Sequence, residues 1–126
     1  MCIRDSYKAR AEAVRHAEVY RGAFAISVCP SEDVESPTIV GAQAANELLN
    51  IIGIKASFVL TEYAGKIYIS SRSIDEINVQ LIMERMGGGG HLNVAGAQLV
   101  GCTISEAKHA IMRTIDEMLE EGDIQE

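Results

Sequence analysis

The sequence lacks tryptophan and contains only two phenylalanines and four tyrosines among its 126 residues. Proteins that bind single-stranded nucleic acid without sequence preference stack successive bases on several aromatic rings. The chain has little material for such a surface. It also contains no run that approaches the roughly 18 apolar residues of a membrane-spanning helix. We therefore expect neither a base-stacking array nor a membrane segment in this chain.

Positive charge is also scarce. Eleven Lys and Arg residues stand against eighteen Asp and Glu residues, which leaves a net charge of −7. Binding of long DNA or RNA draws much of its affinity from Lys and Arg that neutralise phosphates, so we expect no long nucleic acid as partner. A small nucleotide or a short oligonucleotide is compatible with this composition, because a few well-placed cations overcome a global negative field.

Cysteine and histidine occur without the spacings of a metal site. Cys2, Cys29 and Cys102 are far apart and form no Cys-x-x-Cys motif. An odd, scattered set with no secretory signal predicts a reducing cytoplasm and no structural zinc. We interpret Cys29 and Cys102 as small buried hydrophobic residues. His16 and His109 fall at polar positions of helical segments, and we expect both to be solvated.

The length fits one compact domain, since single domains most often hold roughly 100–150 residues. A hydrophobic content of 48% is sufficient for an ordinary core. Residues 1–6 do not continue the helical pattern and are interpreted as a non-native or truncation-derived leader. Residues 7–22 are predicted as a linker helix, residues 23–120 as the folded domain, and residues 121–126 as an acidic tail.

Hydrophobic periodicity and capping signals predict alternating elements within the domain. Expected strands cover residues 23–29, 55–63, 66–71 and 98–102, and expected helices cover residues 36–52, 73–86 and 103–119. Ser36-Pro37 and two capping boxes, which begin at Ser73 and Thr103, predict the three helix starts. In the second helix, Ile74, Ile77, Leu81 and Met86 are predicted to point inward. The expected fold is α/β: a small mixed β-sheet with helices packed on it, in a single domain.

Four consecutive glycines, Gly87 to Gly90, are followed directly by His91. A glycine run is entropically costly unless the backbone conformation requires it. Successive N–H groups without side chains can form a nest for a phosphate, and His91 can donate to a phosphate oxygen or stack on a base. The alternative is a flexible turn that precedes a histidine. The run is neither a Walker loop nor a dinucleotide fingerprint, because it lacks Gly-Lys-Ser/Thr and follows a helix.

A second candidate element is Ser70-Ser71-Arg72-Ser73, at the end of a predicted strand and the start of a predicted helix. Arg72 is placed to bind a phosphate with two hydrogen bonds, aided by serine hydroxyls and the helix N-terminus. The alternative is a surface ion pair for Arg72 and a purely capping role for Ser73. Asn78, one turn further on, either faces the same site or is an ordinary polar surface residue.

Residues 71–99, SRSIDEINVQLIMERMGGGGHLNVAGAQL, resemble the C-terminal nucleotide-binding domain of DHH-family phosphoesterases. The hallmark of that domain is Gly-Gly-Gly-His followed closely by small Ala and Gly residues. The combination of Arg-Ser, Ile-Asn-Val-Gln and four glycines is most similar to the cyclic di-AMP phosphodiesterases. The similarity extends over SVCPSEDVESPTIVGAQAANELLNIIGIKASFVL and so spans roughly residues 7–120.

The resemblance implies a two-lobed enzyme in which an upstream lobe with Asp-His-His holds two manganese ions and this domain holds the nucleotide. It also implies which residues contact the substrate: Arg72, Ser73, Asn78, Gly88, Gly89, Gly90 and His91. No Asp-His-His occurs in this chain, so no metal and no catalytic residue is expected in it. We therefore expect the parent protein to hydrolyse cyclic di-AMP to linear pApA and this chain alone to be inactive.

Two alternatives stay open. One is the matching lobe of an oligoribonuclease or exonuclease of the same superfamily, and the other is a non-catalytic RNA-binding module like that of alanyl-tRNA synthetases. The expected partners are cyclic di-AMP or a short oligonucleotide and the DHH metal lobe of the same parent chain, with a homodimer as a further option. The expected location is the cytoplasm, with a parent that N-terminal segments could anchor to a membrane.

Overall fold

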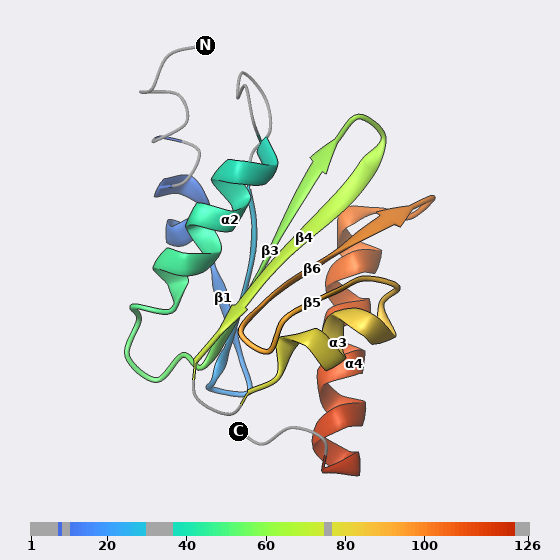
Figure 1. The fold of residues 1–126 in the computed structure, drawn as a ribbon. Helices are drawn as coiled ribbons and strands as arrows, with labels where there is room; N and C mark the ends of the chain where they lie inside the picture. Colours follow the sequence, from blue (N-terminus) through green and yellow to red (C-terminus); the bar gives the residue numbers. More distant parts are fainter. Residues whose placement is uncertain (1–7, 9–10, 30–36, 75–76, 123–126) are drawn as a thin grey trace.

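The computed structural model describes residues 8, 11–29, 37–74 and 77–122 (Figure 1). Its centre is a six-stranded mixed sheet in the order β1-β2-β3-β4-β6-β5. The strands are β1 (Glu18–Tyr20), β2 (Phe24–Val28), β3 (Ala56–Tyr63), β4 (Lys66–Ser73), β5 (Gly89–Gly90) and β6 (Val94–Val100). The helices bounded in full are α2 (Pro37–Leu48), α3 (Val79–Arg85) and α4 (Ile104–Glu121). The expected α/β fold is confirmed.

The helices cover both faces of the sheet (Figure 1). The parallel strands β2 and β3 are joined through α2, which packs on β3 and β4. Its core contains Val40, Ala44 and Leu48 together with Val59 of β3. The opposite face carries the larger core, where α3 and α4 pack on aliphatic side chains of the central strands. The sheet is therefore the middle layer of three.

Small residues let α2 approach the sheet closely. A Cβ atom added to Gly41 would lie 2.7 Å from Oγ1 of Thr61 on β3. One turn further on, the Ser57 hydroxyl donates to the Ala45 carbonyl at 2.7 Å. Such close packing fixes the position of α2 over β3 and the inner part of β4.

Several local signals are confirmed by the structure. Ala64 and Gly65 both have positive φ, 55° and 78°, as a tight hairpin turn between β3 and β4 requires. The Thr103 hydroxyl accepts from the Glu106 N–H at 3.1 Å, and the Glu106 carboxylate accepts from the Thr103 N–H at 2.9 Å. This capping box begins α4, and Gly122 ends the helix in the left-handed conformation.

The prediction of a helix through residues 7–22 is wrong at its end. Residues 11–15 are helical, but Glu18–Tyr20 form strand β1, which pairs antiparallel with β2. The turn between them contains Arg21 and Gly22, both with positive φ. Hairpin pairing with the buried strand β2 overrides the helical propensity of this segment.

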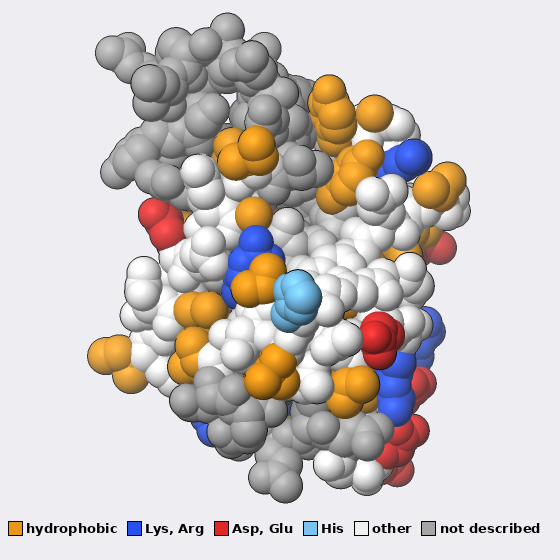
Figure 2. Space-filling view, viewed as in Figure 1, with side chains coloured by type: hydrophobic (Ala, Val, Ile, Leu, Met, Phe, Trp, Pro, Cys, Tyr) orange, Lys and Arg blue, Asp and Glu red, His pale blue; other side chains and the backbone are white. Residues whose placement is uncertain are grey.

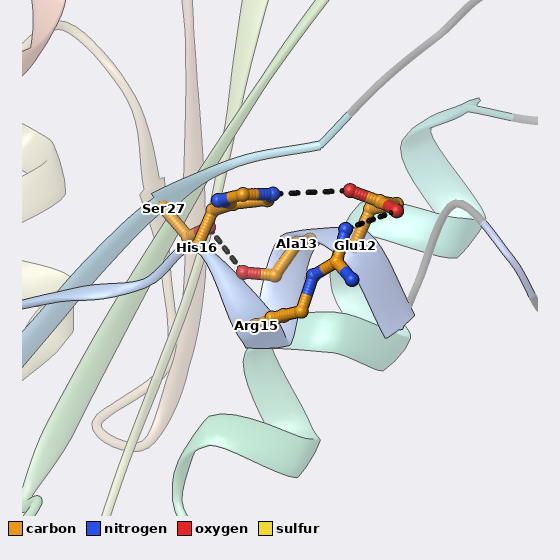
Figure 3. A network of polar contacts seen from close by, with 5 residues as sticks. All are labelled: Glu12, Ala13, Arg15, His16 and Ser27. Carbon is orange, nitrogen blue, oxygen red and sulfur yellow. Dashed lines mark hydrogen bonds and ion pairs between the residues drawn. The ribbon is translucent and has the colours of Figure 1, made fainter.

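Polar contacts hold the short N-terminal helix against β2 (Figure 3). The Ser27 hydroxyl of β2 donates to the Ala13 carbonyl. On the exposed side, Arg15 forms an ion pair with Glu12 at 2.6 Å, and His16 lies 3.1 Å from the other carboxylate oxygen. The His16 side chain is solvated, as expected, and its partner belongs to the same helix.

Two predicted helix boundaries are also wrong. Helix α2 ends at Leu48 rather than at residue 52, because Ile51 and Ile52 are exposed and find no core to bury them. Helix α3 begins at Val79 rather than at Ser73, which is the last residue of β4. Residues 75 and 76 of the capping box predicted at Ser73 lie outside the described residues.

The inward face predicted for this second helix is right at Ile77 and Met86, which reach the core, and wrong at Ile74 and Leu81. Ile74 and Leu81 are exposed, whereas the side chains of α3 that enter the core are Val79, Ile82 and Met83. Ile77 is fully buried, but from the loop that precedes the helix. The predicted Ser36 cap of α2 also lies outside the described residues.

A polar cluster joins the edge strand β1 to α4. The Tyr20 hydroxyl lies 2.8 Å from both carboxylate oxygens of Asp116, and the Arg21 guanidinium donates to the same carboxylate at 2.7 Å. The hydrogen bond from Tyr20 is the largest effect and lowers the pKa of Asp116. Burial opposes it, and the hydrogen bond and charge of Arg21 lower the pKa further. The ionised carboxylate therefore stabilises the folded state.

This cluster gives a pH-dependent prediction. A lowered folded-state pKa gives stability that is present above the unfolded value near 4 and is lost as the pH falls through the folded pKa. We expect Asp116→Asn to lower the unfolding free energy at pH 7 by on the order of 0.5 kcal/mol, since the pair is partly exposed. Urea unfolding at pH 7, 5 and 3 should show this difference shrinking at pH 3. A difference independent of pH would contradict the assignment, and Tyr20→Phe serves as the control that keeps the carboxylate.

Candidate functional site

The register of β4 and β6 brings polar residues of both strands onto one face. Tyr68 pairs with Gln98, Ser70 with Gly96 and Arg72 with Val94. Opposite residues of an antiparallel pair share a face, and every second residue of a strand returns to it. We call these six residues the β4–β6 face. Val94 and Gln98 are exposed on it, so α2 leaves this part of the sheet open.

Arg72 lies at the end of this face where β6 begins, opposite Val94. Its side chain is partly buried, and its Nη1 donates to the Ser71 carbonyl at 2.8 Å. Within the described part of the chain no carboxylate pairs with it. Burial lowers the pKa of the guanidinium, which nevertheless stays charged at neutral pH. The fold thus holds a partly desolvated cation whose remaining donors can bind an anion.

The glycine run forms the edge of the sheet beside this cation. Gly89 and Gly90 form strand β5, which pairs with Gly96 and Ala95 of β6. A Cβ atom on Gly88 would lie 2.1 Å from the Gly96 carbonyl oxygen, and one on Gly90 would lie 2.5 Å from Cα of Ala95. These two glycines are therefore required for close approach of two backbones.

Gly89 differs from its neighbours. Its φ is not positive, and a Cβ atom added to it would meet nothing within 4 Å. Gly87, in contrast, has a φ of 88°. Two N–H groups of the run already have partners, because Gly87 donates to the Glu84 carbonyl at 3.1 Å and Gly88 to the Met83 carbonyl at 2.8 Å. The open space at Gly89 leaves room for a ligand to approach the backbone there, and an anion-binding nest stays a prediction.

His91 follows β5, and Val94 of β6 lies between it and Arg72 in the sheet register. Its N–H donates to the Val94 carbonyl at 2.7 Å, and Val94 is the residue paired with Arg72. The His91 side chain is exposed. In Figure 2 a histidine lies beside a Lys or Arg side chain near the middle of the visible face, with acidic side chains toward its margins. Contact of Arg72 or His91 with a substrate stays a prediction.

Ser73 supports the loop that carries His91. Its hydroxyl donates to the Ile77 carbonyl at 2.7 Å, lies 3.3 Å from the Leu92 carbonyl and accepts from Nδ2 of Asn93 at 2.9 Å. The side chain is buried on the face of β4 opposite to Arg72, as is that of Ser71. Of the three serines in Ser70-Ser71-Arg72-Ser73, only Ser70 shares the face of Arg72. Asn93 is a residue that sequence reasoning missed, since an isolated Asn in a loop has no distinctive pattern.

Asn78 has a structural partner as well. Its side-chain oxygen accepts from the Leu81 N–H at 3.2 Å, and it is the N-cap of α3. This cap replaces the one that was predicted at Ser73. Both side chains hold the segments on either side of the glycine run. Contact of Ser73 or Asn78 with a substrate stays a prediction.

A pocket of about 560 Å³ extends along the β4–β6 face beyond Arg72. Tyr68, Ser70 and Gln98 line it together with the backbone of Gly88 and Gly96. Sequence reasoning did not select Tyr68 or Ser70 individually, because neither carries a motif. Their neighbourhood depends on the pairing of β4 with β6, and the alternation of residues in β4 is the one sequence signal that could have grouped them with Arg72.

Other reactive groups are separate from this face. Burial raises the pKa of the Cys29 thiol to about 11, so Cys29 is no nucleophile at neutral pH. Cys102 is partly buried against the core, and His109 is exposed on α4. Within the ranges that the structure describes, no three His, Cys, Asp or Glu side chains gather closely enough to hold a metal ion. The described residues therefore do not fit manganese.

The described helices do not meet the requirements of a membrane span. None of them combines sufficient length with sufficient apolar character to cross a bilayer.

Comparisons with known proteins identify the family of this chain. The DHHA1 domain model matches residues 22–121. The chain is 43% identical over 112 residues to the cyclic-di-AMP phosphodiesterase PdeA of Listeria monocytogenes, covering 88% of this chain and 17% of that protein. It is 40% identical over 120 residues to the cyclic-di-AMP phosphodiesterase GdpP of Bacillus subtilis, covering 94% of this chain and 18% of that protein. The chain thus spans less than a fifth of the length of these relatives.

Two solved structures share the fold. An exopolyphosphatase-related protein from Bacteroides fragilis aligns with a TM-score of 0.80 and 22% identity, over 94% of this chain and 36% of that protein. The C-Ala domain of Aquifex aeolicus alanyl-tRNA synthetase aligns with a TM-score of 0.57 and 19% identity, over 78% of this chain and 96% of that domain. The chain belongs to the DHHA1 domain family of DHH-family phosphoesterases, close to the cyclic di-AMP phosphodiesterases.

Proposed function

We propose that this domain binds the phosphates and nucleoside of cyclic di-AMP, or of its linear product pApA, as one lobe of a DHH-family phosphodiesterase. The observation that supports this most directly is the partly buried Arg72, which has no carboxylate partner among the described residues and lies across β6 from the glycine edge strand and His91. Two similar proteins, PdeA and GdpP, are named for cyclic di-AMP. The names of these relatives and the site geometry therefore favour the same ligand class.

In this proposal the residues bind and orient the substrate, and hydrolysis takes place on another lobe. Arg72 donates two hydrogen bonds to a phosphate, the backbone of Gly88, Gly89 and Gly90 lines the same site, and His91 donates from the side. Ser73 and Asn78 hold this arrangement through the neighbouring loop and α3. The manganese ions and the attacking water belong to the DHH lobe of the parent protein, which we place in the cytoplasm. The chain by itself is then a binding domain without hydrolytic activity.

Isothermal titration of the 126-residue chain with cyclic di-AMP and with pApA tests this function. We expect measurable binding of at least one of the two, weakened by added salt because phosphate contacts contribute. A folded chain that binds neither would overturn the proposal. Much tighter binding of short linear RNA than of either dinucleotide would instead favour the oligoribonuclease alternative.

The fold similarity to the C-Ala domain keeps the RNA-binding module as a second candidate. A net charge of −7 argues against it, since nonspecific RNA binding needs an excess of cations. A gel shift with tRNA at low salt distinguishes the two, because phosphate-driven binding is strongest there. We expect no shift, and a shift that is stronger than dinucleotide binding would favour the RNA-binding module.

A further inference from the structure

The pocket next to the Arg72 site differs from it in chemistry. Among the described residues that line the pocket, none carries a charge. A phosphate gains little from such surroundings, whereas an uncharged and planar group with polar edges fits them. The glycine backbone along one side leaves room for a flat group to approach closely. The pocket therefore suits a different part of a nucleotide from the one that Arg72 suits.

Three side chains of the pocket have unused polar groups. In the described structure, no hydrogen bond engages the Tyr68 hydroxyl, the Ser70 hydroxyl or the Gln98 amide. The Tyr68 side chain is partly buried, which holds its ring in place, while Gln98 is exposed directly opposite on β6. A fixed aromatic ring next to a free amide is the combination that stacks a base and reads its edge.

We propose that Tyr68 and Gln98 form a nucleobase subsite for adenine, a claim that rests on the dinucleotide-binding function proposed above. The Tyr68 ring stacks on the base. The Gln98 amide offers one donor and one acceptor, which match N7 and the N6 amino group of adenine. Ser70, between Tyr68 and Arg72 on the same face, is available to the sugar.

The spacing along β4 makes this subsite distinct from the phosphate site. Tyr68 and Arg72 are four residues apart, which corresponds to roughly 14 Å along an antiparallel strand. A phosphate ion or a ribose phosphate at Arg72 cannot extend over that distance. A ligand occupies the phosphate site and the base subsite together only if it carries a base beyond the phosphate held at Arg72. A dinucleotide does so.

Titrations of the chain with pApA, pUpU and ribose 5-phosphate test the subsite. Loss of base stacking typically weakens binding by about tenfold, so we expect Tyr68→Ala to reduce pApA affinity by about that factor. Tyr68→Phe, which keeps the ring, should stay within about twofold of wild type. Gln98→Ala, at an exposed position where folding is not at risk, should reduce the preference for pApA over pUpU. Ribose 5-phosphate binding should be unchanged in all three variants.

The outcomes separate this inference from the proposed function. Binding of pApA that is lost in an Arg72 variant but unchanged in Tyr68→Ala and Gln98→Ala overturns the subsite and leaves the function intact. A wild-type chain that binds neither pApA nor cyclic di-AMP rejects both. Thermal unfolding of each variant shows whether a loss of affinity reflects a loss of structure, and a Tyr68→Ala chain that fails to fold leaves Gln98→Ala to decide.

Discussion

Replacing Gly88 with alanine is expected to destabilise the protein by about 2–3 kcal/mol and to lower its melting temperature by roughly 10 °C. The added Cβ atom would lie 2.1 Å from the Gly96 carbonyl oxygen and 2.7 Å from Cα of Ala97. Both are backbone atoms of β6, so no side-chain rotation relieves the overlap. The chain must instead move β5 away from β6, which breaks the pairing that places His91.

Gly89→Ala is the matched control, one residue further along the same run. Its added Cβ atom meets nothing within 4 Å, and its φ is not positive. We expect a change in unfolding free energy of no more than about 0.5 kcal/mol, with slight stabilisation from the reduced entropy of the unfolded chain. Urea unfolding monitored by circular dichroism measures both variants. Equal stability of Gly88→Ala and Gly89→Ala would contradict the proposed backbone contact.

The same pair of variants bears on the role of the glycine run. The fold explains glycine at positions 88 and 90 by contact with β6, and at position 87 by positive φ. Nothing in the described fold requires it at position 89. A ligand that approaches the β5 backbone would require glycine at this position. In that case Gly89→Ala keeps the stability of the wild-type protein and loses dinucleotide affinity.

Signals that act within a few residues predicted the local structure well. The capping box of Thr103 with Glu106 and the turn at Ala64-Gly65 both form as expected, because each completes its hydrogen bonds or dihedral angles within one turn. The prediction was wrong where two local signals compete. Ser73 and Asn78 are both good caps, and the choice depends on β4 extending to Ser73 through its pairing with Ala56.

Long-range pairing explains the remaining differences. Residues 18–20 form a strand because β2 offers an open edge, and a helical pattern contains no information about that edge. The pocket of Tyr68 and Gln98 likewise exists through the register of β4 and β6, two segments thirty residues apart in the sequence. Composition argues against an array of stacking rings. One tyrosine is nevertheless enough for one base, which a count of aromatic residues does not reveal.

Arg72 should show opposite effects on stability and on binding. Burial without a carboxylate partner in the described structure makes its charge a cost to folding, as the lowered pKa indicates. Arg72→Met keeps most of the aliphatic packing and removes that charge. We therefore expect a melting temperature equal to or above that of wild type. Dinucleotide affinity should fall by roughly 10- to 100-fold, since hydrogen bonds to a charged group are lost.

Arg113→Met is the control for this effect, because it removes the same unit charge from an exposed position on α4. Both variants change the net charge equally, so a general electrostatic effect would weaken binding in both. An effect confined to Arg72 requires direct contact with the ligand. Titration with cyclic di-AMP and thermal unfolding of the same samples provide the two readouts. A variant at Arg72 that loses stability while it keeps full affinity would show that this cation serves the fold, and the phosphate site would then have to lie elsewhere.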